Sequence, residues 1–429
     1  MGSTSTNKTM QSLNVIILAA GKSVRMKSAT PKILHSLCGR PMIQYNTDLV
    51  RSLGSLKTYI VLGHQSDLIK RQLQKNMRVV IQRKLLGTAD AVKQTLPLIK
   101  GFKGDILVLC ADTPLLTKET IGRLIKFHQQ TKADCTLLSC AVNDPRGYGR
   151  IIRGLNNSIL AIREEKDTLE DEKSIKEINT GVYCFRSQIL QKAVKAVNLN
   201  QKKKEFYLTD VVEFLVHNNA KVETLQTEDA TEGLGINTRQ DLLRAEKIMR
   251  QRILDRLMHQ GVAIRDADTV FIDHDVTIGQ ETTIYPFSII EGDVLIGRRC
   301  KIGPFCHIRS GVRIADETEV GNFTEVSRAK MGKNCFMKHF SFLGDAIVGD
   351  RVNIGAGVVT ANFDGKDKNT TRIADDAFIG SDSILIAPLS IGEKAVTGAG
   401  SVVTRNQTIP KESIVVGVPA RMISRRTIK

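Results

Sequence analysis

A six-residue repeat dominates the second half of the chain. From position 272 to position 326, an aliphatic residue stands at every sixth position without a gap. An α-helix repeats every 3.6 residues and a strand every two, so neither produces this spacing. Hexads of one short strand and one corner do, when they stack with the aliphatic side chain pointing inward. The pattern therefore predicts a parallel β-helix. The residues of the repeat are Ile272, Ile278, Ile284, Ile290, Ile296, Ile302, Ile308, Ile314, Val320 and Val326.

The repeat slips after Ala329 and resumes further along. Isoleucine-glycine pairs begin again at Ile354, Ile379 and Ile391. The segment 362–371 interrupts the repeat, as a loop that protrudes from one coil would do. We therefore expect the β-helix to continue to the end of the chain.

The first half has a different pattern. Apolar runs at residues 13–18, 58–62, 79–81 and 106–109 alternate with amphipathic stretches. This alternation is typical of a doubly wound, mostly parallel α/β sheet of the Rossmann-like kind. Because ligands of such sheets bind at the carboxyl ends of the strands, functional residues should directly follow these runs.

An amphipathic helix is predicted between the two halves. Apolar residues spaced three or four apart from 242 to 257 form one face, Thr238 and Asp241 stand where a capping box would begin it, and Gly261 would end it. We therefore expect a disordered start at 1–12, an α/β domain at 13–237, a connector helix at 238–261 and the β-helix domain at 262–429.

Composition narrows the functional classes. No apolar run is long enough to span a membrane, and the first twelve residues lack the apolar core of a secretory signal. The eight cysteines include no C-x-x-C pair, which favours buried, reduced thiols in a cytoplasmic protein. Most of the net charge of +17 comes from the first half and suits nucleotide phosphates. The absence of Trp, the few aromatic residues and the lack of a reading motif argue against nucleic acid as a partner.

A turn of small residues follows the first predicted strand. Gly21-Lys22-Ser23 invites a P-loop interpretation, but position 16, where that motif needs a glycine, is Ile. The amides of the turn can instead meet anionic oxygens. Arg25 offers a guanidinium fork to phosphate, and Lys32 a compact charge.

The run from Leu18 to Gly21, with Arg25-Met26 and Pro31-Lys32 after it, resembles the sugar-nucleotide pyrophosphorylases. Further segments, in the family's order, narrow the resemblance to the uridylyltransferase half of the bifunctional N-acetylglucosamine-1-phosphate uridyltransferase / glucosamine-1-phosphate acetyltransferase family. These segments are Gln82 with 86–89, 110–115, 147–151, Glu164 with 166–167, 177–181, 207–210 and 235–237.

The resemblance implies a Mg²⁺-dependent attack of N-acetylglucosamine 1-phosphate on the α-phosphorus of UTP, with release of pyrophosphate. Arg25 and Lys32 would neutralise charge in this step, and no side-chain nucleophile is needed. Asp112 and Asn237 would hold Mg²⁺, which prefers oxygen ligands. The implied UTP or UDP-sugar site comprises Leu18, Ala19, Ala20, Gly21, Lys32, Gln82, Gly87, Thr88, Asp112, Gly149, Glu164, Asn179, Thr180 and Asn237.

Polar segments of the predicted β-helix resemble the acetyltransferase half of the same family. His339 matches the general base that takes a proton from the amino group of glucosamine 1-phosphate as it attacks acetyl-CoA, a task suited to an imidazole. The implied acceptor-sugar residues are Arg309, Asn353, Asn362 and Lys368, the last serving a neighbouring subunit. The implied acetyl-CoA residues are Ala356, Asn362, Phe363, Ser381 and Ala399.

Two positions depart from the family pattern on the acceptor side. The family has a lysine at the position of Ser327 and a tyrosine at that of Phe342. Each lost charge-assisted contact to a phosphate would cost about 1.5–3 kcal/mol if it were desolvated. Arg328 or Lys330 would be the replacement cation, although alternation along a strand can turn Arg328 away.

Three functions remain open from the sequence. The leading one is a two-reaction enzyme that makes UDP-N-acetylglucosamine, and the resemblance implies a homotrimer of left-handed β-helices with acyl-transfer sites between subunits. The alternative is a uridylyltransferase whose β-helix only holds the trimer together or acetylates another amino sugar. A nucleic-acid-binding protein is the least favoured.

Overall fold

The computed structural model describes residues 13–22, 24–73, 77–200 and 204–423, which form two compact units. Unit 1 contains the described residues up to Leu37 together with Pro41–Glu246, and unit 2 contains Cys38–Arg40 and the described residues from Lys247 onward. The expected disordered start at 1–12 and Ser23 lie outside the described residues. The boundary falls inside helix α8 (Arg239–His259), the predicted connector.

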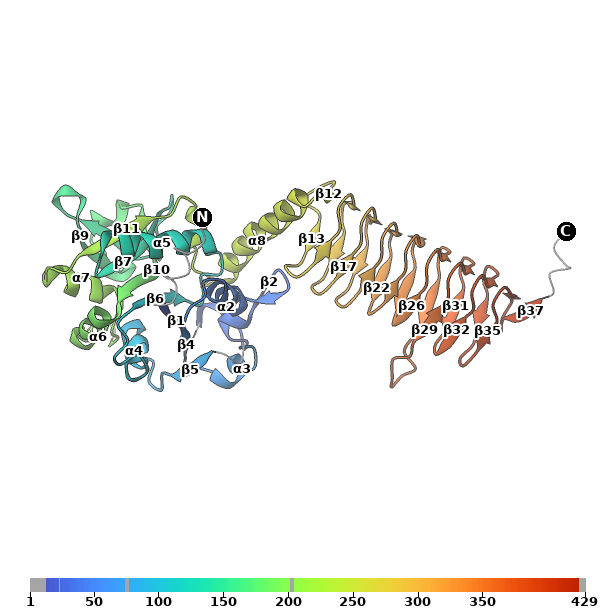
Figure 1. The fold of residues 1–429 in the computed structure, drawn as a ribbon, viewed down its shortest axis with the longest axis horizontal. Coiled ribbons are helices and arrows are strands. Elements are labelled where there is room, and N and C mark those ends of the chain that lie inside the picture. The colour runs from blue at the N-terminus through green and yellow to red at the C-terminus, as the bar shows by residue number, and fades with distance from the viewer. Residues whose placement is uncertain (1–12, 23, 74–76, 201–203, 424–429) are drawn as a thin grey trace, which may run out of the picture. The chain divides into compact units, whose positions relative to one another are not determined.

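The sheet of unit 1 is doubly wound and mostly parallel, as predicted (Figure 1). Its strand order is β11-β7-β10-β6-β1-β4-β5, with β10 antiparallel to both of its neighbours. β8 and β9 form a hairpin that extends from β10. The strands are β1 (Leu13–Ala19), β4 (Lys57–Leu62), β5 (Arg78–Ile81), β6 (Asp105–Cys110), β7 (Cys135–Ala141), β8 (Arg150–Arg153), β9 (Ile159–Arg163), β10 (Glu177–Arg186) and β11 (Val222–Gln226).

Alternation along the central strand separates two hydrophobic cores. Ile16 and Leu18 of β1 face a core shared with α4, α6 and α7, whereas Val15 and Ile17 face one shared with α2, α3 and α5. Burial on both faces explains why every residue of β1 except Asn14 is apolar. The helices are α2 (Met42–Ser52), α3 (Ser66–Lys70), α4 (Thr88–Lys93), α5 (Lys118–Thr131), α6 (Ser187–Ala196) and α7 (Thr209–His217). The 3-10 helices are η1 (Val24–Met26), η2 (Lys32–Leu34), η3 (Leu96–Leu98), η4 (Leu155–Asn157), η5 (Glu165–Asp167), η6 (Glu172–Ser174) and η7 (Ala230–Gly233).

Unit 2 is the predicted parallel β-helix, with three sheets as its faces. The first face consists of β12 (Ala263–Ile264), β15 (Thr283–Ile284), β18 (Lys301–Ile302), β21 (Glu319–Asn322), β24 (Phe336–His339), β27 (Asn353–Ile354), β30 (Phe378–Ile379), β33 (Val396–Thr397) and β36 (Ile414–Val416), with β37 (Arg421–Ile423) antiparallel to β36. The second consists of β13 (Phe271–Ile272), β16 (Ile289–Ile290), β19 (His307–Ile308), β22 (Glu325–Ser327), β25 (Phe342–Gly344), β28 (Val359–Ala361), β31 (Ile384–Ile386) and β34 (Val402–Val403). The third consists of β14 (Thr277–Ile278), β17 (Leu295–Ile296), β20 (Arg313–Ile314), β23 (Lys330–Met331), β26 (Ala346–Val348), β29 (Thr371–Ile373), β32 (Leu389–Ile391) and β35 (Thr408–Ile409).

The hexad residues form the interior of this β-helix. All ten members of the repeat are at most 4% exposed. Regular coils advance 18 residues, as in the pairing of Ile284 with Ile302. The slip in the sequence corresponds to coils of 17 residues, in which Met331 and Met337 take the inward positions. The predicted protrusion is also present, because the coil that joins β28 to β29 is longer and extends a loop (Figure 1).

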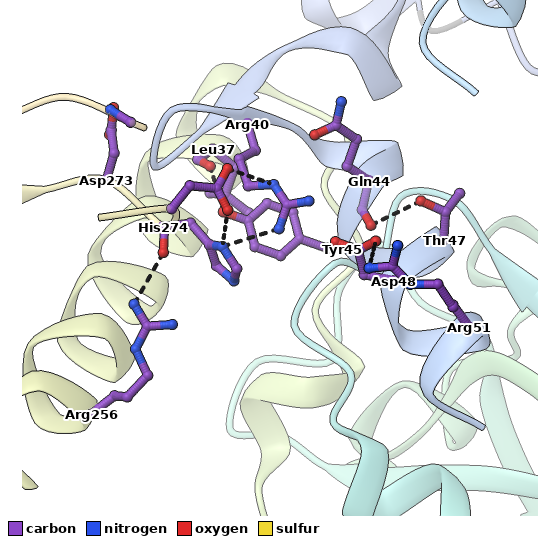
Figure 2. Close-up of polar contacts among 12 residues, drawn as sticks. Leu37, Arg40, Gln44, Tyr45, Thr47, Asp48, Arg51, Arg256, Asp273 and His274 are labelled. Carbon is purple, nitrogen blue, oxygen red and sulfur yellow. Dashed lines mark hydrogen bonds and ion pairs between the residues drawn. The ribbon is translucent and has the colours of Figure 1, made fainter. Parts of the chain in front are cut away.

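A hairpin from the first half of the sequence supplies part of unit 2. β2 (Ser36–Leu37) and β3 (Arg40–Pro41) flank its tip. The Arg40 guanidinium lies 3.0 Å from Nδ1 of His274, and the carbonyl of His274 accepts a hydrogen bond from Arg256 of α8 (Figure 2). The backbone N–H of His274 donates to the carbonyl of Cys38 (3.0 Å). Gly39, at φ +81°, lies so close to Asp273 that a Cβ would be 2.9 Å from the Asp273 Cβ and nearer still to its carboxyl group.

Two predictions from composition can be checked. Among the described residues, no helix is long and apolar enough to cross a membrane. All eight cysteines are free, and seven of them are buried, as expected for small apolar residues. The eighth, Cys110, is only half-buried at the end of β6.

Candidate active sites

A cavity of about 810 Å³ opens at the carboxyl ends of the parallel strands of unit 1. Residues that directly follow β1, β4, β5 and β6 line it, where a doubly wound sheet binds its ligands. Eleven of the predicted residues are among its walls: Leu18, Ala19, Ala20, Gly21, Arg25, Lys32, Gln82, Gly87, Thr88, Asp112 and Asn237.

Lys32 joins the two predicted metal ligands. Its ammonium donates to Oδ2 of Asp112 at 2.5 Å and to Oδ1 of Asn237 at 2.9 Å. The Lys32 side chain is 12% exposed and that of Asp112 is 26% exposed. Two oxygen atoms from residues 125 positions apart in the sequence therefore converge on one cation.

Backbone contacts fix both oxygen donors. Asp112 follows β6, and its carbonyl accepts a hydrogen bond from the backbone N–H of Ile236 (2.9 Å), next to Asn237. The carboxylate of Asp241 accepts from the backbone N–H groups of Asn237 (3.0 Å) and Thr238 (2.8 Å), while Thr238 Oγ1 accepts from the N–H of Asp241 (3.1 Å). This reciprocal pair is the predicted capping box, and it positions Asn237 as well as starting α8.

Side-chain hydrogen bonds hold the wall of the cavity that carries Gln82, Gly87 and Thr88. Gln82 is buried and donates to the carbonyl of Gly87 (3.0 Å) and to Asp90 (2.8 Å). Gly87 has φ +100°, and a Cβ there would lie 2.9 Å from the Phe206 nitrogen and nearer to its carbonyl oxygen. Thr88 Oγ1 accepts from the N–H of Leu208 at 2.9 Å. Only glycine fits position 87. The chain passes close to Phe206 there, and this places Gln82 and Thr88 on the same wall of the cavity.

Four predicted sugar residues lie beyond the cavity walls. Gly149 and Asn179 are joined by a backbone hydrogen bond of 2.8 Å, and the side-chain amide of Asn179 donates to Tyr183 Oη (2.7 Å). Thr180 is buried and donates to the carbonyl of Leu138 (2.8 Å), while Glu164 accepts from Thr209 (3.1 Å). The structure thus places these four outside the 810 Å³ cavity, with their side chains or backbone already in hydrogen bonds.

Several cavity residues were not assigned a role from the sequence. His64, Glu205, Tyr207 and Lys166 line the same walls. His64 follows β4, so the rule that functional residues come after strands could have found it. Tyr207 and Lys166 stand inside segments that carried the family resemblance, although no function was attached to them.

Cys110 is a cavity residue that cannot serve as a nucleophile near neutral pH. Burial, with the nearby charge of Asp112, raises the pKa of its thiol to about 12. A thiol rather than a thiolate therefore faces the cavity.

One corner of the β-helix carries the predicted acetyl-transfer residues in a single column. The corner between the first and second faces has a left-handed residue in each of four successive coils, at Phe340, Gly357, Asp382 and Gly400. His339, Ala356, Ser381 and Ala399 directly precede those residues. The imidazole and the three small side chains therefore occupy the same position in four successive coils. We call these four residues the corner strip. His339 ends β24 and is exposed.

Phenylalanines continue the same corner toward the start of the β-helix. Phe287, Phe305, Phe323 and Phe340 are each about half exposed. The ring of Phe305 stacks on Phe287 (centroids 4.8 Å apart) and on Phe323 (5.0 Å). We call these four residues the phenylalanine ladder, and a shallow groove of about 510 Å³ runs beside it.

The remaining predicted acyl-transfer residues lie on the first face and at the next corner, between the second and third faces. Asn353 is half-buried on β27 of the first face, and Arg309 follows β19 with its guanidinium 3.1 Å from Glu325. Phe363 and Lys368 are exposed and pair across the neck of the protruding loop, whose first residue, Asn362, is buried.

Ser327 and Phe342, the two departures from the family pattern, have surroundings that the sequence did not indicate. Ser327 is buried, and its Oγ accepts a hydrogen bond from Arg328 (2.8 Å). The Arg328 guanidinium forks onto Asp345 at 2.7 and 2.8 Å. Asp345 also accepts from Asn362, and these contacts, that with Arg328 first, lower the pKa of its carboxyl group. The candidate replacement cation is therefore already neutralised, and Phe342 lies half-buried on β25.

Comparisons with known proteins agree with the division of the chain into two units. Residues 14–248 match the model of the nucleotidyl transferase family, 275–306 and 293–328 match bacterial transferase hexapeptide repeats, and 370–405 match the hexapeptide repeat of succinyl-transferase. Similar proteins are the "Bifunctional protein GlmU" of Halalkalibacterium halodurans and of Bacillus subtilis strain 168, each 39% identical over 94% of this chain and 95% of the relative. That of Geobacillus thermodenitrificans is 40% identical over 94% of both chains. The chain therefore belongs to the bifunctional GlmU family.

Proposed function

We propose that this chain makes UDP-N-acetylglucosamine in two reactions, one in each unit. The β-helix acetylates glucosamine 1-phosphate with acetyl-CoA, and the α/β unit transfers a uridylyl group from UTP to the product. The observation that carries the proposal is the pair of chemically distinct sites on a chain alignable with GlmU over 94% of its length: an oxygen-ligand cluster in a basic nucleotide cavity, and an exposed imidazole at the head of the corner strip.

The oxygen pair suits Mg²⁺. Asp112 and Asn237 already share a cation, the Lys32 ammonium, which supports their use for a metal ion. Among the described residues no group of three or more metal-binding acidic, His or Cys side chains occurs, and Mg²⁺ commonly takes one or two protein oxygens together with substrate phosphates. When bound, Mg²⁺ would neutralise charge on the phosphates.

The residues of the cavity position the two phosphate-bearing substrates, UTP and the sugar phosphate. Gln82 and the turn from Leu18 to Gly21 bind the uridine, and Arg25 and Lys32 supply positive charge to the phosphate oxygens. Such transfers depend mainly on positioning and charge stabilisation, so the sugar phosphate displaces pyrophosphate without a covalent enzyme intermediate. Gly149, Glu164, Asn179 and Thr180 bind the N-acetyl sugar.

In the second reaction His339 accepts a proton from the attacking amino group. Its exposed position at the end of β24 leaves the imidazole accessible to a substrate. The small side chains of Ala356, Ser381 and Ala399 leave room along the corner strip for the extended coenzyme. Arg309, Asn353, Asn362 and Lys368 bind the acceptor sugar, and Phe363 and Asn362 border the coenzyme.

We also propose that the chain acts as a homotrimer in the cytoplasm. The phenylalanine ladder is an exposed apolar surface at the same corner as His339, which an adjacent subunit would cover. The eight free cysteines fit a reducing compartment.

One observation favours a narrower function. Because Ser327 carries no charge and both Arg328 and Arg309 are paired with acids, less positive charge is free for an acceptor phosphate than the family pattern supplies. An amino sugar without phosphate would then be the better acceptor, or the β-helix would serve assembly alone.

A single preparation tests both reactions. We expect Asp112→Ala to abolish pyrophosphate release from UTP and N-acetylglucosamine 1-phosphate while coenzyme A release stays near normal, and His339→Ala to do the reverse. Loss of both products in either variant, with the fold intact by circular dichroism, would contradict two independent sites.

A further inference from the structure

Lys32 occupies the place that a metal ion would take. Its ammonium is within hydrogen-bonding distance of both Asp112 Oδ2 and Asn237 Oδ1. A Mg²⁺ ion needs its oxygen ligands at about 2.0–2.1 Å. A Mg²⁺ ion that bridged the same two oxygen atoms would take the position of the ammonium, so the two cations compete for it.

We propose that Lys32 is an internal counterion that holds the metal position closed until a nucleoside triphosphate enters, and then exchanges it for the metal ion. This inference rests on the proposed function, because it takes Asp112 and Asn237 as the metal ligands. Lys32 thus positions the ligand oxygens as well as contacting phosphate.

Lys32 has an anionic partner available both before and after the exchange. The partners of its ammonium are the two ligand oxygens, and its side chain is largely buried beside them. Lys22 and Arg25 line the same cavity, so a triphosphate bound among these cations offers Lys32 a second anionic partner within the site. Phosphate would draw the ammonium off Asp112 as the metal ion takes its place.

The exchange makes metal binding conditional on nucleotide. The apparent affinity of a ligand falls by the fraction of molecules in which its site is accessible. If Lys32 occupies the oxygens in nine of ten molecules, metal binds about tenfold more weakly to the free enzyme than to a site without the lysine. By reciprocity, the metal ion and the nucleotide each strengthen the binding of the other.

The test uses Mn²⁺ as the probe and the electron paramagnetic resonance signal of free Mn²⁺ as the readout. Titrations compare the wild-type protein with Lys32→Met and with Lys32→Gln, which retains a polar end should the apolar variant misfold. Without nucleotide, we expect both variants to bind Mn²⁺ at least about tenfold more tightly than wild type. Lys22→Met removes a cavity lysine that makes no hydrogen bond to Asp112 or Asn237 among the described residues, and should leave Mn²⁺ affinity within about twofold.

A non-hydrolysable UTP analogue distinguishes failure of the exchange from failure of the metal assignment. With the analogue bound, wild type should gain Mn²⁺ affinity by a larger factor than Lys32→Gln. Equal or weaker Mn²⁺ binding by the Lys32 variants without nucleotide, with Asp112→Ala still abolishing binding in the complex, would refute the exchange and leave the metal assignment intact. Unchanged Mn²⁺ binding by Asp112→Ala in the complex would overturn the metal assignment and the exchange together.

Discussion

Replacing Phe305 by glutamate should dissociate the proposed trimer. Phe305 is the central member of the phenylalanine ladder and has a ring on each side. Its exposed fraction of 45% corresponds to about 90 Å² of a side chain of about 200 Å². If a neighbouring subunit covers that area, its burial stabilises assembly by about 2 kcal/mol per subunit, or about 7 kcal/mol per trimer. Removing it should weaken the trimer constant by about five orders of magnitude, before the cost of burying a carboxylate is added.

Sedimentation velocity from nanomolar to micromolar protein measures this effect. Leu295→Glu is the matched control, because Leu295 is also 45% exposed but lies on β17 of the third face, which does not border the ladder. We expect wild type and Leu295→Glu to sediment as trimers and Phe305→Glu as a monomer. Pyrophosphate release should persist in the monomer while coenzyme A release falls. A Phe305→Glu trimer as tight as wild type, or equal dissociation by both variants, would refute the assignment of this corner to the interface.

Further predictions concern stability. Gly39→Ala should lower the free energy of unfolding by about 1–3 kcal/mol more than Gly54→Ala, measured by urea denaturation, because both glycines have positive φ but only Gly39 lies against Asp273. Ile302→Ala should cost about 2–5 kcal/mol in the same assay, since this fully buried residue packs between coils. Burial, with the nearby charges of Glu213 and other acids, raises the pKa of Asp210 to about 6, so the folded state resists its ionisation. Asp210→Asn should therefore stabilise the protein by roughly 1–3 kcal/mol at pH 7, and the gain should fall to near zero as the pH drops well below about 3.9, where Asp210 is mostly protonated in both states. A gain that persists at pH 3.5 would show that charge is not the cause.

The fold was predictable where a periodic pattern determined it. The hexad required a β-helix because no other regular structure places every sixth side chain inside, and all ten repeat residues are buried. The alternation of strands and helices predicted the sheet for a similar reason. The slip after Ala329 was visible in the sequence, but its cause was not. The coil there is one residue shorter, and Met331 and Met337 take the inward positions. Nothing in the sequence distinguishes these two methionines from other apolar residues.

The contacts that depend on register could not be predicted. Arg328 pairs with Asp345 because that coil advances 17 residues, whereas a regular coil of 18 would place Ala346 beside it. The tip of the hairpin at 38–40 belongs to unit 2 through contacts with residues more than 200 positions away, which no local pattern indicates. Likewise, the family resemblance assigned Lys32, Asp112 and Asn237 to one site, but only coordinates place the ammonium between the two oxygens.

The most direct test of the two-reaction proposal is coenzyme A release from acetyl-CoA with glucosamine 1-phosphate as acceptor and glucosamine as the comparison. The account predicts release at an enzymatic rate with the phosphorylated sugar and its loss in His339→Ala, despite Ser327 and the pairing of Arg328 with Asp345. No release with glucosamine 1-phosphate, while the same preparation still forms pyrophosphate from UTP and N-acetylglucosamine 1-phosphate, would contradict it and leave the α/β unit as the only working enzyme.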